Sequence, residues 1–385
     1  MFGDLEAAED AVQEACALAV AKWPATGVPA NPRSWLIGTA RHRQLDWLRR
    51  EAGRPQKEAT AVRELDRGWR GPDDTWPLGD DELALIFLCC HPALDGEVRV
   101  PLTLRCVCGL STAEIAAVFL VPEATMSQRL VRAKRKIRQA GISFRVPGRD
   151  ELDGRLNAVL RVIYLVFTQG HLATRGDVLV RGELCDQAVR LARALAGLLP
   201  GEPEVIGLLA LLLLTDARRS ARVDAAGELV LLDDQDRGLW DRALIAEGEE
   251  LLERALRTGR PGLYQLHAAI AACHCAAAPG ATDWREIAAL YGELIRYEPT
   301  PVVAANRAVA VAMADGPAAG LVILDTIAVH PGLANWPQFH IARAELLRRL
   351  GRMGESRDAY QAALKTAPPL PEQAFIERRI RELPE

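Results

Sequence analysis

The segment LSTAEIAAVFLVPEATMSQRLVRAKRKIR, residues Leu110–Arg138, predicts two helices joined by a short turn. Ser111 and Glu114 have the spacing of a capping box, in which each side chain accepts a backbone N–H at the start of a helix. The first helix should therefore begin after Ser111 and run through Phe119. Leu120-Val121-Pro122 then makes the turn, so the segment has the pattern of a helix-turn-helix.

The second helix should begin near Glu123 and end at about Gln139. Its apolar residues recur at helical spacing and should form one buried stripe: Met126, Leu130, Ala133 and Ile137. Its polar and basic residues should remain outward or flanking: Thr125, Ser127, Gln128, Arg129, Arg132, Lys134, Arg135, Lys136 and Arg138.

Such a second helix suits the major groove of DNA. Arg and Gln side chains can donate to purine edges, whereas Lys and Ser side chains can contact phosphates. The buried stripe fixes the angle at which these groups are presented. The alternative interpretation is an ordinary helical hairpin whose basic face is merely solvated.

The residues before this segment predict two more helices. Leu5–Trp23 has helical apolar spacing and should stop before Pro24, because the residue before a proline disfavours helical backbone. Asn31-Pro32 predicts an N-cap followed by a first-turn proline, with a helix running to about Arg50. Residues 51–79 are rich in Gly and Pro and read as a linker, and helical spacing resumes from residue 80 to 140, interrupted at Pro92, Pro101, Gly109 and Pro122.

Composition limits the class of protein. The chain has 385 residues, 49% of them hydrophobic, and a net charge of −4, which favours two or three folded domains. The most apolar run, Val205–Thr215, is shorter than the roughly 18–20 residues that span a bilayer, so it predicts a buried helix and no membrane partner. No export signal is evident, which predicts a cytoplasmic protein with reduced cysteines.

Three cysteine clusters raise the question of a metal. They are Cys89-Cys90-His91, Cys106-x-Cys108 and Cys273-His274-Cys275. None has the two-to-four-residue gap of a zinc knuckle, which favours buried structural cysteines over metal ligands. The chain also lacks a Gly-rich phosphate loop, an HExxH motif and a nucleophile elbow. We therefore expect no metal, no cofactor and no enzymatic activity.

The C-terminal part, beyond Arg149, keeps helical periodicity. Tyr291, Leu324 and Tyr360 are separated by 33 and 36 residues, and each precedes a proline by seven or eight residues. This spacing is near the roughly 34-residue tetratricopeptide period, and Ala342–Pro368 is the clearest unit. Stacked helix pairs form a concave surface that can bind a peptide or a partner protein. The alternative is a domain that only fills space.

Three stretches, in this order, resemble extracytoplasmic-function sigma factors of RNA polymerase: AEDAVQEA (Ala8–Ala15), NPRSWLIGTARHRQLDWLRR (Asn31–Arg50) and the segment Leu110–Arg138. In that family they correspond to a polymerase-binding helix, a promoter-melting helix and a helix-turn-helix. Four further stretches are similar to the subgroup with a long helical C-terminal extension: FLCCHPAL (Phe87–Leu94), LLALLLLTDARRSAR (Leu208–Arg222), LLDDQDRGLWD (Leu231–Asp241) and NRAVAVA (Asn306–Ala312).

The resemblance implies roles for three sets of residues. The minus-35 element would be read by Glu123, Thr125, Ser127, Gln128, Arg129, Arg132, Lys134 and Arg135. The minus-10 element would be captured as single strand by Asn31, Trp35, Arg41, His42, Arg43, Gln44, Trp47 and Arg50, a mixture of aromatic and basic groups. Core polymerase would be bound through its beta-prime clamp helices and beta flap, with the clamp helices contacting Glu9, Asp10, Gln13 and Glu14.

The expected fold is all-α. Sigma region 2 would occupy residues 1–50, a linker 51–79, the region 4 helix-turn-helix 80–141, and a helical extension 142–385 with tetratricopeptide-like repeats from about residue 283. The expected function is an alternative sigma factor that binds core RNA polymerase, recognises both promoter elements and initiates transcription.

Two other classes of function stay open at this point. A polymerase-independent helix-turn-helix regulator with a protein-binding repeat domain would need dimer symmetry and no acidic docking helix. A helical-repeat scaffold would need no basic recognition helix. The first helix also has apolar residues on more than one side, so we expect an upstream start or a partner that covers this surface.

Overall fold

The computed structural model describes residues 5–52, 78–119, 121–142, 144–171, 181–224, 230, 232–276, 282–366, 368 and 370–384. The described residues form an all-α protein, as predicted. They divide into two compact units, residues 1–116 with 121–156 and residues 117–120 with 157–385. The predicted linker, residues 51–79, falls almost entirely outside the described residues.

The helices of the first part have these bounds: α1 Leu5–Thr26, α2 Pro32–Ala52, α4 Leu78–Cys89, α5 Gly96–Cys106, α6 Thr112–Val118 and α7 Glu123–Gln139. Helices α1 and α2 pack against each other through a small core of Ala11, Ala15, Ala40 and Leu36. The predicted start of α2 is confirmed, because Asn31 Oδ1 accepts the Ser34 backbone N–H at 3.0 Å. A local side-chain cap therefore sets where this helix begins.

The predicted end of α1 at Trp23 is wrong. The helix continues through Pro24 to Thr26, because a proline near the end of a helix removes only one backbone hydrogen bond of the last turn. Gly27 terminates the helix instead: its φ of 79° is left-handed, and its N–H donates to the Trp23 carbonyl oxygen at 2.9 Å.

The predicted interruption at Pro101 is also wrong. Helix α5 begins at Gly96 after the N-cap Asp95 and runs through Pro101 to Cys106. The proline ring removes the N–H that would bond to the Glu97 carbonyl oxygen, but the proline is buried, so packing offsets that loss. Turns do separate the helices near Pro92, Gly109 and Pro122, as predicted.

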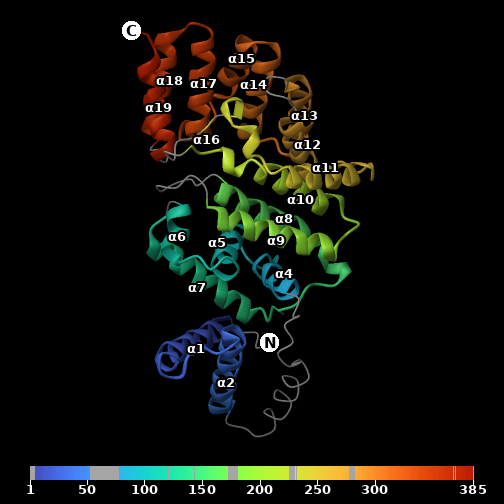
Figure 1. Cartoon of the computed structure of the whole chain (residues 1–385), viewed down its shortest axis with the longest axis vertical. Helices are drawn as coiled ribbons and strands as arrows, with labels where there is room; N and C mark the ends of the chain where they lie inside the picture. Colours follow the sequence, from blue (N-terminus) through green and yellow to red (C-terminus); the bar gives the residue numbers. More distant parts are fainter. Residues whose placement is uncertain are drawn as a thin grey trace. The chain divides into compact units, whose positions relative to one another are not determined.

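The remaining helices are α8 Arg149–His171, α9 Gly182–Leu198, α10 Pro203–Asp216, α11 Arg242–Leu256, α12 Leu263–Ala276, α13 Trp284–Tyr297, α14 Pro301–Asp315, α15 Pro317–Ile327, α16 Pro331–Ala334, α17 Pro337–Arg349, α18 Met353–Lys365 and α19 Leu370–Glu382. Helix α10 packs against α9, α11 and α12 (Figure 1). Its residues from Val205 to Leu214 are all buried, as the apolar run predicts.

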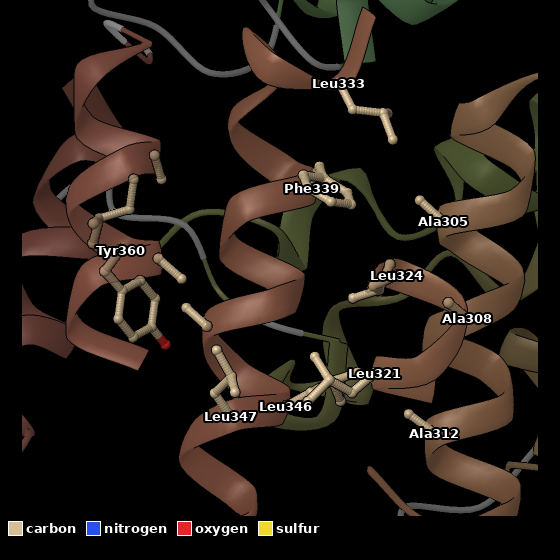
Figure 2. Packing of buried hydrophobic residues seen from close by; sticks show 14 of the residues in the cluster. Ala305, Ala308, Ala312, Leu321, Leu324, Leu333, Phe339, Leu346, Leu347 and Tyr360 are labelled. Carbon is tan, nitrogen blue, oxygen red and sulfur yellow. The ribbon is translucent and has the colours of Figure 1, made fainter. Parts of the chain in front are cut away.

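From α12 onward the helices follow one another as packed pairs, α12 with α13, α14 with α15 and α17 with α18. Side chains from α14, α15, α16, α17 and α18 share one apolar core, in which Phe339, Leu324 and Tyr360 are buried (Figure 2). Gly320 on α15 lets two helices approach closely, because a Cβ there would overlap the Ala308 carbonyl oxygen of α14.

Candidate nucleic-acid interface

The capping box at the start of α6 forms as predicted. Ser111 Oγ accepts the Glu114 backbone N–H at 3.2 Å, and Glu114 Oε2 accepts the Ser111 backbone N–H at 2.8 Å. The helix ends at Val118, one residue before the predicted end at Phe119. After the turn, the Val121 N–H donates to the Ala116 carbonyl oxygen at 3.1 Å. These local bonds hold the helix-turn-helix together.

Helix α7 has the predicted buried stripe, made by Met126, Leu130, Ala133 and Ile137. Five of the predicted minus-35 residues are exposed on the rest of the helix: Glu123, Ser127, Gln128, Arg132 and Arg135. Thr125 and Arg129 are half-buried, and Arg129 Nη2 lies 4.0 Å from the Glu97 carboxylate of α5. A row of polar and basic groups therefore faces outward from a helix whose apolar side is fixed.

Lys134, which was expected to lie outward or flanking, takes a flanking position and is largely covered. Its side chain is only 11% exposed, and Lys134 Nζ lies 2.6 Å from Glu9 Oε2 of α1. The lysine sits on the side of α7 that contacts α1, where an acidic residue compensates its charge. Glu9 was itself predicted to bind polymerase, so the structure brings together two residues predicted to serve different partners.

The other predicted polymerase-binding residues remain accessible. Asp10, Gln13 and Glu14 are exposed on α1, whereas Glu9 is half-buried. The i, i+3, i+4 spacing of the exposed three places them on one helix face. Glu14 Oε2 lies 3.7 Å from Arg43 Nε of α2, and both side chains are partly exposed, so this pair contributes little to stability.

The predicted minus-10 residues lie on α2 and the loop before it. Asn31 and His42 are exposed, and Arg41 and Arg43 are half-buried. Trp35 is half-buried and makes an edge contact with Trp23 of α1, with ring centroids 5.5 Å apart. The side chains of Gln44, Trp47 and Arg50 lie outside the described residues.

Trp23 was not among the predicted site residues. Its Nε1 donor is buried without a partner, and its ring supports Trp35 from the neighbouring helix. Nothing in the sequence distinguishes Trp23 from the other tryptophans as a site residue. Only the packing of α1 against α2 shows that the two indoles form one aromatic surface.

Three cysteine thiols at the C-terminal ends of α4 and α5 have shifted pKa values. A hydrogen bond with Cys106, followed by burial, raises the pKa of Cys89, and the same hydrogen bond lowers the pKa of Cys106. Burial raises the pKa of Cys90 to about 12. Within the described part of the chain, no group of three or more His, Cys, Asp or Glu side chains is arranged to hold a metal ion.

Comparison with known families identifies the domains. The family described as "Sigma-70 region 2" matches residues 1–54, and the family described as "Sigma-70, region 4" matches residues 84–137. The chain belongs to the sigma-70 family of RNA polymerase sigma factors. It is therefore a promoter-binding transcription factor and not an enzyme, which confirms the expectation of a non-enzymatic function.

The sigma factor carries a further domain after region 4. A "Family of unknown function (DUF6596)" matches residues 155–256. The chain is also 44% identical over 387 residues to "Uncharacterized protein R00370" of Rhizobium meliloti (strain 1021), covering 99% of this chain and 91% of that protein. No solved structure matches the sigma factor. None of its described helices is long and apolar enough to cross a membrane.

Proposed function

We propose that this chain is an alternative sigma factor of the extracytoplasmic-function type that acts in the cytoplasm. In this proposal α7 reads the minus-35 element, and α2 with its preceding loop captures the minus-10 element. Helix α1 binds the beta-prime clamp helices of core polymerase, and region 4 binds the beta flap. The holoenzyme then initiates transcription.

The observation that carries the proposal is the arrangement of α7. Its four stripe residues are buried, so the helix cannot rotate, and Ser127, Gln128, Arg132 and Arg135 are all presented to solvent. Glutamine and arginine donors on a fixed helix match the donor and acceptor pattern of the major groove. The exposed acidic residues on α1 provide a separate surface for a basic partner.

Run-off transcription with purified core polymerase, on the DNA upstream of the chain's own gene, tests this function. We expect a defined transcript that requires the chain and is lost in Gln128→Ala and Arg135→Ala variants. An Arg296→Ala variant is the matched control, because Arg296 is an exposed, ion-paired arginine of α13. Specific DNA binding with no transcript, and no capture of core polymerase in a pull-down, would favour the polymerase-independent regulator instead.

The proposal extends to the domain arrangement, with region 2 at 1–50, a linker at 51–79, region 4 at 80–141 and the extension at 142–385. The packed helix pairs from α12 to α19 support a tetratricopeptide-like repeat region from about residue 283.

We propose that this region binds a peptide or protein and controls the sigma domains. Removing the residues after Gly148 should then change promoter-dependent transcription, and equal transcription from the truncated and full chains would contradict a regulatory role.

A further inference from the structure

Two segments of the extension lie outside the helices that we propose to read the promoter, namely Leu208–Arg222 and Leu231–Asp241. The structure brings their ends together: the Asp241 N–H donates to the Ala217 carbonyl oxygen at 2.9 Å. The Trp240 ring, which is 3% exposed, then lies beside two guanidinium groups. The Cζ atom of Arg237 is 4.6 Å from the ring centroid, and that of Arg218 is 5.9 Å from it.

Arg218 differs from the arginines beside it. Arg219 Nη2 is ion-paired with Asp186 at 2.7 Å and Asp216 at 2.8 Å, and Arg222 Nη1 donates to the His171 carbonyl oxygen at 2.7 Å. Within the described residues, no carboxylate lies within ion-pair distance of Arg218, and its Nε is buried without a hydrogen-bond partner.

Two further polar atoms near Arg218 are buried without partners. Trp240 Nε1 can only donate a hydrogen bond, and it has no acceptor. His274 Nδ1 is also unpartnered; burial, and then the nearby charges of Arg218 and Arg237, lower the pKa of this histidine to about 4. His274 is therefore neutral near pH 7 and can donate from Nδ1.

Among the described residues, these groups together lack an acceptor that carries negative charge. Buried donors are normally paired, and a buried cation without a counter-charge costs free energy unless an anion binds to it. A cation–π contact with Trp240 compensates only part of this loss. Arg218, Arg237 and His274 are each half-buried, so part of each side chain meets solvent, whereas the unpartnered Nε of Arg218 and Nδ1 of His274 are buried.

We propose that Arg218, Trp240 and His274, with Arg237 beside them, bind an oxyanion, either a carboxylate or a phosphate group. Arg218 would supply the charge, and the indole N–H of Trp240 would orient the bound group. This gives the extension a ligand of its own, separate from promoter DNA. The proposal stands independently of the function assigned above to the sigma domains.

Nuclear magnetic resonance of the full chain can follow the Trp240 indole N–H, assigned by its loss in Trp240→Phe. The probes are inorganic phosphate and acetate, each titrated against chloride at constant ionic strength. We expect a saturable downfield shift of this signal with one or both probes. Saturation with phosphate only would identify a phosphate site, and saturation with acetate only would identify a carboxylate site.

The Arg218→Gln variant should weaken that binding by about tenfold or more, as expected on losing one charge-assisted hydrogen bond. Arg193→Gln is the matched control, because Arg193 is an arginine of the same unit whose Nη2 pairs with Glu247 Oε2 at 2.7 Å. This control should bind like the unmodified chain.

A second measurement covers the case in which Arg218→Gln fails to fold. Phosphate or acetate should raise the melting temperature of the unmodified chain and of Arg193→Gln, and less so that of Trp240→Phe, which keeps a ring but has no N–H. A Trp240 signal that does not saturate with either probe, or equal responses in all variants, would overturn the proposal.

Discussion

Two arginine-rich stretches of this sigma factor look alike in sequence and end up in opposite environments. In VRAKRKIR, residues 131–138 of α7, Arg132 and Arg135 project into solvent. In ARRSAR, residues 217–222, the chain follows the buried helix α10 and folds into a short 3-10 turn from Arg219 to Ala221. There the guanidinium groups turn toward acidic residues, a backbone carbonyl and a tryptophan.

The difference comes from what occupies the rest of each segment. In α7, apolar residues at helical spacing take one face, so charge is left on the other. After α10 the acidic partners Asp186 and Asp216 are placed by two different helices and draw Arg219 inward. A basic run therefore indicates a nucleic-acid surface only where several of its side chains remain exposed, as Arg132 and Arg135 do.

The largest expected effect is on Arg219. Arg219→Ala leaves Asp216, whose side chain is 5% exposed, without its cationic partner, and breaking such a pair should lower the free energy of unfolding by about 3 kcal/mol. Arg135→Ala on α7 should change it by less than about 0.5 kcal/mol. Urea denaturation measures both, and similar losses in the two variants would remove the contrast between the segments.

For DNA affinity, substitutions on α7 should have a larger effect than substitution of Arg219. Gln128→Ala or Arg129→Ala should cost about 1–3 kcal/mol of binding free energy, specifically at the base pair that the side chain contacts. Arg219→Ala, if folded, should bind promoter DNA normally. Binding titrations on substituted minus-35 sequences make the comparison. If Gln128→Ala, Arg129→Ala and Lys134→Ala all leave affinity and footprint unchanged, α7 does not read the groove.

Acid should destabilise the extension before it affects α7. Burial, and then Arg222, lowers the pKa of His171 to about 2, and burial with Arg218 lowers that of His274 to about 4. The unfolded chain binds protons at these histidines below about pH 6.5, whereas the folded chain does not. Stability is therefore full above pH 6.5 and falls as the pH drops toward each folded value.

The free energy of unfolding should fall by up to about 1.4 kcal/mol per pH unit for each histidine. Hydrogen exchange of the α10 amides between pH 7 and pH 5, corrected for intrinsic exchange, reports this local stability. A His274→Gln variant should show a shallower slope. Unchanged protection across this range would mean that the histidines are not buried as neutral groups.

The smallest expected effect concerns Lys134, which its ion pair with Glu9 holds away from DNA. Glu9→Gln releases Lys134 from its ion pair and should strengthen DNA binding by less than about 1 kcal/mol, the range of partly exposed pairs. The gain should disappear when Lys134→Ala is added. An equal gain in that double variant would show that Glu9 acts only through general charge.

Local rules account for the parts of the fold that were predicted. The Ser111–Glu114 box, the Asn31 cap and the stripe beginning at Met126 all involve residues within a few positions of one another, so their spacing is visible in the sequence. The proline predictions failed at Pro24 and Pro101 because a proline removes one hydrogen bond, and that loss can be offset by a later glycine or by packing.

The candidate site also has features that the sequence predicts and contacts that it does not. Periodicity separates Gln128 and Arg135, which face solvent, from the buried stripe. It cannot show that Lys134 meets Glu9, 125 residues earlier, or that Trp35 rests on Trp23 of the preceding helix. Those contacts depend on how helices pack, and no pattern within either helix specifies the partner.

The sequence by itself determined that the chain is helical, where the helix-turn-helix begins and which face of α7 is apolar. Caps and apolar spacing act within one or two helical turns, so they can be recognised in the sequence alone. Only the tertiary structure decided which arginines stay outside. The fate of Arg218 and Arg219 depends on whether Trp240, Asp186 and Asp216 arrive beside them, and electrostatic partners are chosen by distance in space rather than along the chain.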